Sequence, residues 1–323
     1  MIKENSENIE DEKRNSSVHI SVLLHEVIEN LNLEKGDIFV DMTVNGGGHS
    51  SAIAPLLGKD GILIGIDADP TALVRGAKKL KDSPAKVHLV ADNFRNLKQI
   101  LANLKIEKVN KILFDLGLSS HELESSGRGF SFQKDEPLLM TFPTDSTKVS
   151  FTASDIVNTW DEDNIASILE GYGEERFAKR IARRIVEVRK MQEIKTTQEL
   201  VDIIKNAVPG WYRSGRKAHF ATRTFQALRM TVNDEIRALD EALNAAWDVL
   251  APNGIIAVIS FHSMEDRMVK KFFKEKSHGG GATLITKKPI VPSEEELEMN
   301  RRARSAKLRV IKKAKSLKKK DYK

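Results

Sequence analysis

The chain has 323 residues, 40% hydrophobic and 30% charged, a composition typical of a globular protein with a sizeable core. It has no cysteine, which excludes disulfides, thiolate metal sites and thiol nucleophiles, and no apolar run near the roughly 20 residues of a membrane-spanning helix. The net charge of +6 is uneven, because residues 301–323 hold 12 Lys or Arg against one acid. The rest is mildly acidic, so this end is either a nucleic-acid contact or a solvated tail.

Residues 1–17 are polar and lack the apolar stretch of a secretion signal, so we expect a disordered leader. An amphipathic helix is predicted over 21–33, where apolar residues recur at helical spacing. Strands are then predicted at 37–41, 62–67, 86–92 and 111–117, alternating with helices at 50–57, 70–81 and 96–104. This alternation indicates an α/β fold with a parallel sheet covered by helices on both faces.

The alternation then stops. Glycines and prolines are frequent over 118–150, and helical spacing dominates from 154 to 208, including a highly charged helix over 174–190. Later elements are a long helix at 222–249, strands at 255–261, 282–288 and 307–313, and a polar, mobile segment at 292–300. We therefore predict an α/β domain in two pieces, 18–123 and 218–311, split by an all-helical insertion at 124–217 and followed by a basic tail at 312–323.

Polar side chains follow the predicted strands where each one ends. In chain order they are Asp41 with the glycines after it, Asp67, Asp92 followed by Phe94, Asp115, and His262. Ligands of open α/β sheets bind at the carboxyl ends of strands, so we expect these groups to surround one site. A single glycine run is equally well a turn, and a single strand-end aspartate is more often a helix N-cap, so the prediction depends on the five ends together.

The predicted site fits a cofactor that contains adenosine. Glycines let the backbone approach a ligand, an acid after the second strand can accept from ribose hydroxyls, and Phe94 offers a face to adenine. The dinucleotide fingerprint G-x-G-x-x-G fails, because Ser51 stands at its third glycine. Asp41, just before the glycines, is more typical of methyltransferases, where it faces the methionine end of S-adenosylmethionine. That cofactor is favoured over a nicotinamide.

With these motifs, the sequence resembles the 16S ribosomal RNA cytosine-N4 methyltransferases of the MraW/RsmH type. The similarity runs from about His19 to Val310 and includes VDMTVNGGGHS, IGIDADP, DLGLSSHEL, RGFSF, YGEERFAKRIARRIV, ATRTFQALRMTVNDE, VISFHSMEDRMVKKF and NRRARSAKLRV. The resemblance implies a Rossmann-like S-adenosylmethionine-dependent methyltransferase domain with an inserted helical substrate-recognition domain. It also implies methylation of the exocyclic amine of a cytidine at the decoding centre of the small ribosomal subunit.

The resemblance also implies a set of cofactor-binding residues. They are Gly47, Gly48 and His49 in the glycine loop, Asp67 at the ribose, Phe94 at the adenine, Asp115 near the methionine moiety, and Glu122. Glu122 stands where many members have glutamine, so it keeps an acceptor but loses the amide donor.

The segment after RGFSF departs from the family. Members usually have D-G-P-L-D-M-R-M-D, whereas this chain has DEPLLMTFPTD, so Leu139, Thr141 and Pro143 replace an acid, an arginine and an acid. Phe220 also replaces a proline before ATRTFQA. Two alternatives stay open: a diverged methyltransferase of the same fold with another RNA or protein target, and a cofactor-binding ribosome-assembly factor with weak catalysis.

The acceptor amine defines what the site must supply. Cytosine N4 is a weak nucleophile, because its lone pair is delocalised into the ring, so an enzyme must orient the amine and remove a proton. Methylation at carbon 5 is disfavoured, since it normally requires a cysteine. Asp115 is the candidate catalytic proton acceptor. The alternative is that Asp115 binds only the cofactor and backbone carbonyls orient the amine.

His262 is a second candidate base. However, Ser263 and Asp266 fit a capping box, with Ser263 as N-cap, which favours a structural role for this segment and leaves His262 lining the pocket. The other histidines lack metal-ligand spacing, so no metal site is expected.

We expect RNA contacts from Arg128, Arg223 and the basic tail. The helix at 174–190 is ambiguous, because Glu175 with Lys179 and Arg183 with Glu187 are i,i+4 pairs typical of a solvated face. The expected partner is 16S rRNA or the small ribosomal subunit, in the cytoplasm and without a membrane. The sequence leaves open a homodimer, and whether the substrate is free RNA or an assembled subunit.

Overall fold

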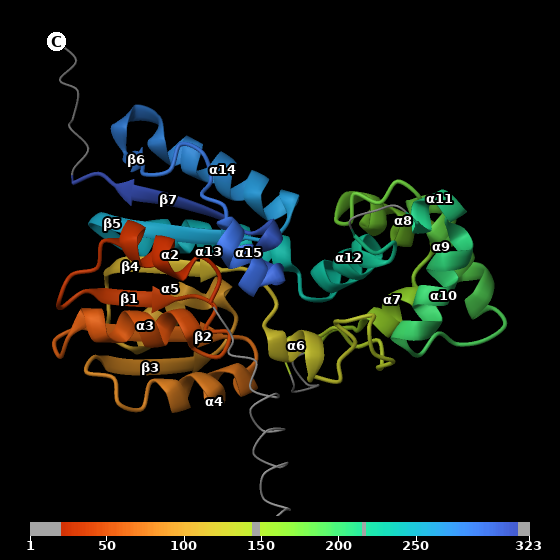
Figure 1. Ribbon diagram of the computed structural model, residues 1–323, viewed down its shortest axis with the longest axis horizontal. Coiled ribbons are helices and arrows are strands. Elements are labelled where there is room, and N and C mark those ends of the chain that lie inside the picture. Colours follow the sequence, from red (N-terminus) through yellow and green to blue (C-terminus); the bar gives the residue numbers. More distant parts are fainter. Residues whose placement is uncertain (1–20, 144–148, 215–217, 316–323) are drawn as a thin grey trace, which may run out of the picture.

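A seven-stranded sheet forms the centre of the computed structural model, which describes residues 21–143, 149–214 and 218–315 (Figure 1). The strands, in the spatial order β3-β2-β1-β4-β5-β7-β6, are β1 (Ile38–Asp41), β2 (Ile62–Asp67), β3 (Lys86–Ala91), β4 (Val109–Asp115), β5 (Leu250–Ser260), β6 (Ala282–Leu284) and β7 (Lys307–Lys313). The first five strands are parallel, whereas β7 is antiparallel to both β5 and β6. The predicted α/β class is confirmed.

Helices cover both faces of this sheet. One face packs against α2 (Leu24–Leu31) and α3 (Gly48–Leu57), and the other against α5 (Leu97–Asn103), α13 (Glu235–Val249) and α14 (Ser263–Ser277). Within β4, Leu113 belongs to the first core and Ile112 and Phe114 to the second, the alternation of a strand buried on both sides. The remaining elements here are α4 (Pro70–Lys79), η1 (Phe94–Asn96), α6 (Ser120–Glu124), η3 (His278–Gly280), α15 (Glu294–Met299) and η4 (Arg301–Ser305).

A third core lies beside the sheet, inside a purely helical part of the chain (Figure 1). Its helices are α7 (Ala153–Thr159), α8 (Glu162–Gly171), α9 (Ala178–Arg189), α10 (Thr197–Ala207), α11 (Gly210–Arg213) and α12 (Thr222–Val232). Phe225 and Leu228 of α12 are buried in this core. Across the described residues, no helix is both long and apolar enough to cross a membrane.

The single long helix predicted over 222–249 is wrong, because α12 ends at Val232 and α13 begins at Glu235. Apolar spacing continues through both helices, so periodicity alone could not reveal the break. Asp234 has a left-handed backbone with φ of 48°, which aspartate tolerates better than most residues. Since α12 packs with the helical core, we propose that the insertion ends at this break and not at residue 217.

The C-terminal region also differs from expectation. The polar segment 292–300 is not a mobile loop, because it contains α15, and Glu296 Oε1 accepts a hydrogen bond from Leu23 N at 2.8 Å. Lys312 and Lys313, predicted to begin the tail, are the last residues of β7. Lys313 Nζ donates to two carbonyls at 2.8 Å each, those of Trp247 and Leu250. The predicted leader, and the tail from residue 316, lie outside the described residues.

Candidate functional site

The carboxyl ends of the central parallel strands open onto one pocket of about 80 Å³. It is lined by Met42, Thr43, Asn45, Asp67, Ala68, Phe94, Leu116, Gly117, Glu122, Phe142, Glu235, Ile236, Leu239 and Glu265. Three of the predicted cofactor residues, Asp67, Phe94 and Glu122, therefore meet at this pocket. Of the other four, Gly47 lies in the loop after β1, Gly48 and His49 begin α3, and Asp115 ends β4.

The glycine loop is shaped by close packing as well as by turn geometry. Gly47 caps α3 with φ of 80°, and a Cβ atom added to it would lie 2.8 Å from Gly76 Cα in α4. A side chain is therefore excluded there both by conformation and by space. Beside the loop, His49 is buried, with Nε2 3.0 Å from Val22 O and Nδ1 3.5 Å from Asp115 Oδ2. Burial opposes a charged imidazole, but the nearby Asp115 outweighs it and raises the pKa of His49.

The side chain of Asp41 was expected to face the cofactor, but it lies inside the protein. Its side chain is 1% exposed, and its two oxygens accept hydrogen bonds from Ser50 Oγ at 2.5 Å and Thr43 N at 3.2 Å. Burial raises the pKa of Asp41 to about 6. The carboxylate thus joins the end of β1 to α3 beneath the glycine loop. The sequence could not separate these two roles, because both need an acid at the end of the first strand.

Asp67 lines the pocket at the end of β2. Its carboxylate accepts from the backbone N of Asn45 and of Asp69, each at 2.9 Å, and burial raises its pKa to about 6. Asn45, which the sequence did not single out as a site residue, also donates from Nδ2 to Asp115 O at 3.1 Å. Asn45 therefore ties the ends of β2 and β4 together at the pocket.

Asp115 has one carboxylate oxygen that receives no hydrogen bond from the described residues. Oδ2 lies beside His49, whereas Oδ1 is buried and has no hydrogen-bond partner among the described residues. A buried acceptor without a donor is costly, so this atom fits a group that a ligand supplies.

Glu122 is a buried acid in the wall of the pocket. It forms a reciprocal capping box with Ser119 at the start of α6, in which its Oε2 accepts from Ser119 N at 2.7 Å. Burial, and then the negative charge of Asp67, raise the pKa of Glu122 to about 7. A proton on this carboxyl group at neutral pH restores a donor where many family members have the amide of glutamine.

Arg128, predicted to contact RNA, is buried in the protein instead. Its Nη2 pairs with Asp69 Oδ2 at 2.7 Å, and its Nη1 donates to the carbonyls of Thr141 and Phe142 at 3.0 and 2.6 Å. This geometry argues against direct RNA contact, because the guanidinium holds the unusual 135–143 segment against α4. Arg223 is half-buried and donates from Nη1 to Glu174 O at 2.5 Å, so its role in RNA binding stays a prediction.

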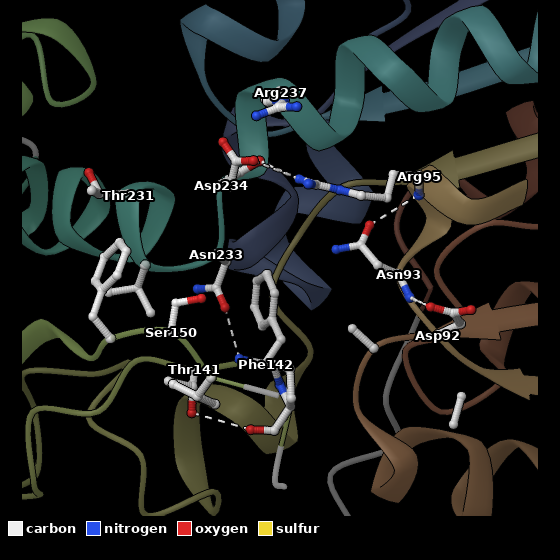
Figure 2. Close-up of a pocket in the computed structure, with 16 residues that line it drawn as sticks. Asp92, Asn93, Arg95, Thr141, Phe142, Ser150, Thr231, Asn233, Asp234 and Arg237 are labelled. Carbon is white, nitrogen blue, oxygen red and sulfur yellow. Dashed lines mark hydrogen bonds and ion pairs between the residues drawn. The ribbon is translucent and has the colours of Figure 1, made fainter. Parts of the chain in front are cut away.

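The 135–143 segment forms one wall of a groove that adjoins the pocket, and Phe142 and Ala68 line both. In Figure 2 the Asn233 side chain holds the backbone of Phe142, while Asn93 and Arg95 lie across the groove. Phe142 also stacks on Phe130, with ring centroids 5.6 Å apart. The departure from the family pattern therefore falls beside the pocket at the strand ends.

The α13–α14 side of the pocket carries a partly buried polar cluster that the sequence did not predict. Arg229 of α12 forms a two-pronged ion pair with Glu235, at 2.8 and 2.9 Å. Glu265 Oε2 accepts from the backbone N of Phe261 and His262. Glu235, His262 and Glu265 place donor atoms within 4.8 Å of one another, a set that can hold a metal ion, although both carboxylates already have protein partners.

The predicted capping box at Ser263 and Asp266 is wrong by one residue. His262 is the N-cap of α14, its Nδ1 accepts from Glu265 N at 3.4 Å, and Glu265 completes the box. Asp266 turns instead to β7, where it pairs with Arg309 at 2.7 Å and Lys307 at 3.2 Å. Either N-cap, His262 or Ser263, places an acid at the third helical position. The helix begins after His262 because Asp266 pairs with the cations of β7 and Glu265 remains for the capping box.

The residues of the pocket fit S-adenosylmethionine. Asp67 has spare lone pairs for ribose hydroxyls, and Phe94, packed edge-on against Phe114, offers an aromatic surface for adenine. The unpartnered Oδ1 of Asp115 fits the ammonium of a methionine moiety or the amine of an acceptor base.

Comparisons with known proteins identify the family of the chain. The model of the MraW methylase family matches residues 16–314. Two relatives are each named Ribosomal RNA small subunit methyltransferase H. The one from Brevibacillus brevis is 46% identical and the one from Heliobacterium modesticaldum 47%, and each alignment covers 91% of this chain and 98% of the relative. A solved rRNA methylase structure from Streptococcus thermophilus aligns at a TM-score of 0.40 and 12% identity, over 97% of this chain and 99% of that one.

Proposed function

Because the chain belongs to the MraW methylase family, we propose that it methylates N4 of a cytidine in the decoding region of 16S rRNA. The family makes it an S-adenosylmethionine-dependent methyltransferase of small-subunit rRNA, and the target atom and region are the finer part of the proposal. The single observation that supports it is the match of nearly the whole chain to relatives named as small-subunit ribosomal RNA methyltransferases. We place the enzyme in the cytoplasm. The homodimer that the sequence leaves open is tested by sedimentation of the purified protein.

The chemistry of the pocket supports amine methylation. S-adenosylmethionine, when bound, supplies an electrophilic methyl group. The chain has no cysteine for the covalent route to carbon 5, whereas buried carboxylates that can accept hydrogen bonds from an amine are abundant: Asp67, Glu235 and Glu265 line the pocket, and Asp115 adjoins it. We assign Asp115 as the group that accepts the proton from the cytidine amine. Its Oδ1 has no hydrogen-bond partner among the described residues, and His49 lies beside its other oxygen.

Mass mapping of methylated cytidines in small-subunit RNA, with and without the protein, tests the proposal. We expect one N4-methylated cytidine in the decoding region only when the protein and S-adenosylmethionine are present. A methyl group at another RNA site or on a protein would favour a diverged enzyme, and an unmodified site in both samples would favour an assembly factor.

Asp115→Asn tests the assigned role. Asparagine keeps the shape of the side chain but accepts a proton poorly, so we expect kcat to fall by about 100-fold or more, the contribution of a general base. Cofactor affinity, measured by calorimetry, separates the alternatives. A loss confined to affinity would make Asp115 a cofactor ligand alone, and unchanged kcat and affinity together would contradict both roles.

A further inference from the structure

Arginine and tryptophan side chains form an exposed patch on the helical part of the molecule, where α9 begins. We define the arginine–tryptophan patch as Arg176, Lys179, Arg180 and Trp211; all four are exposed, Trp211 to 59%. The Arg176 guanidinium lies 5.1 Å from the centre of the Trp211 ring and 5.2 Å from that of Phe177. These are cation–π distances, so cations and aromatic faces form one continuous surface.

The cations of the patch have no carboxylate partners within the described part of the chain. The i,i+4 pair predicted between Glu175 and Lys179 is wrong, because Glu175 is 1% exposed and points inward. The other predicted pair is also wrong, since Arg183 pairs with Glu162, and Arg184 takes Glu187. The acids near α9 are thus used elsewhere, which leaves positive charge at the patch.

Buried contacts fix the geometry of the patch in advance. Glu175 accepts from Tyr212 Oη at 2.6 Å and from Phe177 N at 2.9 Å, which ties the start of α9 to α11. Phe177 also packs edge-on against Tyr212, with ring centroids 4.8 Å apart. A surface that is already ordered loses less conformational entropy when it binds a partner.

Just before the patch in sequence, the helical part contacts α14, one of whose residues lines the pocket. Glu174, two residues before Arg176, accepts from Ser263 Oγ at 3.1 Å and pairs with Arg267 at 2.8 Å, both in the first turns of α14. Glu265 of the same turns lines the cofactor pocket. A ligand bound at the patch therefore lies near the place where the helical part contacts α14, the helix that contributes Glu265 to the pocket wall.

We propose that the arginine–tryptophan patch binds a single-stranded segment of ribosomal RNA, with an unpaired base stacked on Trp211 and the three cations on its phosphates. The proposal rests on the proposed function and names a contact outside Arg128 and Arg223. Single-stranded RNA offers both base faces and phosphates, whereas a duplex hides its base faces. An acidic protein segment would match the charge but would leave the indole face unused.

The test measures binding of the full chain to a 12-nucleotide single-stranded RNA by fluorescence anisotropy at several salt concentrations. Trp211→Ala should weaken binding about tenfold, the loss of one stacked base, whereas Trp211→Phe should keep most of the affinity. Arg176→Ala with Arg180→Ala should reduce the slope of log affinity against log salt by about 1.4, for two lost phosphate contacts. Lys59→Ala with Lys81→Ala, which removes equal charge from exposed turns before β2 and β3, should leave the slope unchanged.

Several outcomes would overturn the proposal. These are equal binding by wild type and the Trp211→Ala variant, equal binding of a duplex of the same length, or equal binding of polyglutamate. S-adenosylmethionine affinity and the thermal midpoint of each variant confirm that the fold is intact, and the arginine double variant decides if Trp211→Ala fails to fold. Cytidine mapping tests the proposed function separately. If the wild type methylates its cytidine but the arginine double variant keeps the wild-type salt slope, only the patch proposal is rejected. If RNA binding depends on the patch but no cytidine is methylated, only the proposed function is rejected.

Discussion

At the scale of single residues, Glu122 makes the free energy of unfolding depend on pH. Its pKa of about 7 lies above the ordinary value near 4.5, so the folded protein binds this proton more tightly than the unfolded chain. Stability from this group is complete below pH 4.5 and is lost as the pH rises to about 7. Glutamine keeps the acceptor for Ser119 N but cannot ionise.

We therefore expect Glu122→Gln to gain stability relative to wild type by about 3 kcal/mol between pH 4.5 and pH 8. Urea unfolding at a series of pH values measures this difference. The exposed Glu29→Gln variant is the control and should run parallel to wild type. A constant difference between Glu122→Gln and wild type across the range would show that Glu122 ionises normally.

The same scale shows where sequence reasoning is strong and where it is weak. Asp67 and Phe94 could be predicted to meet, because strand ends of a parallel sheet share one edge. The pairings of Asp41 and of Arg128 could not be predicted, because their partners, Ser50 and Asp69, are chosen by packing. Nothing in the residue type distinguishes an arginine that meets RNA from one that is buried in an ion pair.

At the scale of elements, Arg128 joins the 135–143 segment to α4. Arg128→Ala leaves Asp69 buried without its cation and removes the donor to two carbonyls, so we expect a loss of about 3–5 kcal/mol in the free energy of unfolding. Urea unfolding measures it, and adding Asp69→Asn should recover part of the loss. The salt dependence of RNA binding should not change, and a reduced slope would restore the predicted RNA contact.

Strands and most helices could be predicted because hydrophobic spacing records which face is buried. The break between α12 and α13 could not, since both helices keep one apolar spacing and only the left-handed backbone of Asp234 separates them. The start of α14 was displaced by one residue for a similar reason, because Glu265 and Asp266 are equivalent in sequence. Local patterns fix the kind of element better than its ends.

At the scale of the whole molecule, the charge of the C-terminus is open to a clean test. Deletion of residues 316–323 removes four lysines and one aspartate while leaving β7 and Lys313 intact. If the tail contacts RNA phosphates, the slope of log affinity against log salt should fall by about two to three. An unchanged slope would make the tail a solvated end, and deletion from residue 312 would confuse the result by damaging the sheet.

The α12–α13 break has a consequence for how the two ligands of the enzyme influence each other. Arg229 stands before the break in the helical part, and its ion-pair partner Glu235 stands after it in the pocket wall. A tilt of the helical part therefore disturbs the cofactor pocket, and filling the pocket restrains the tilt. Thermodynamic reciprocity then requires that RNA change the affinity for S-adenosylmethionine by the same factor as S-adenosylmethionine changes the affinity for RNA.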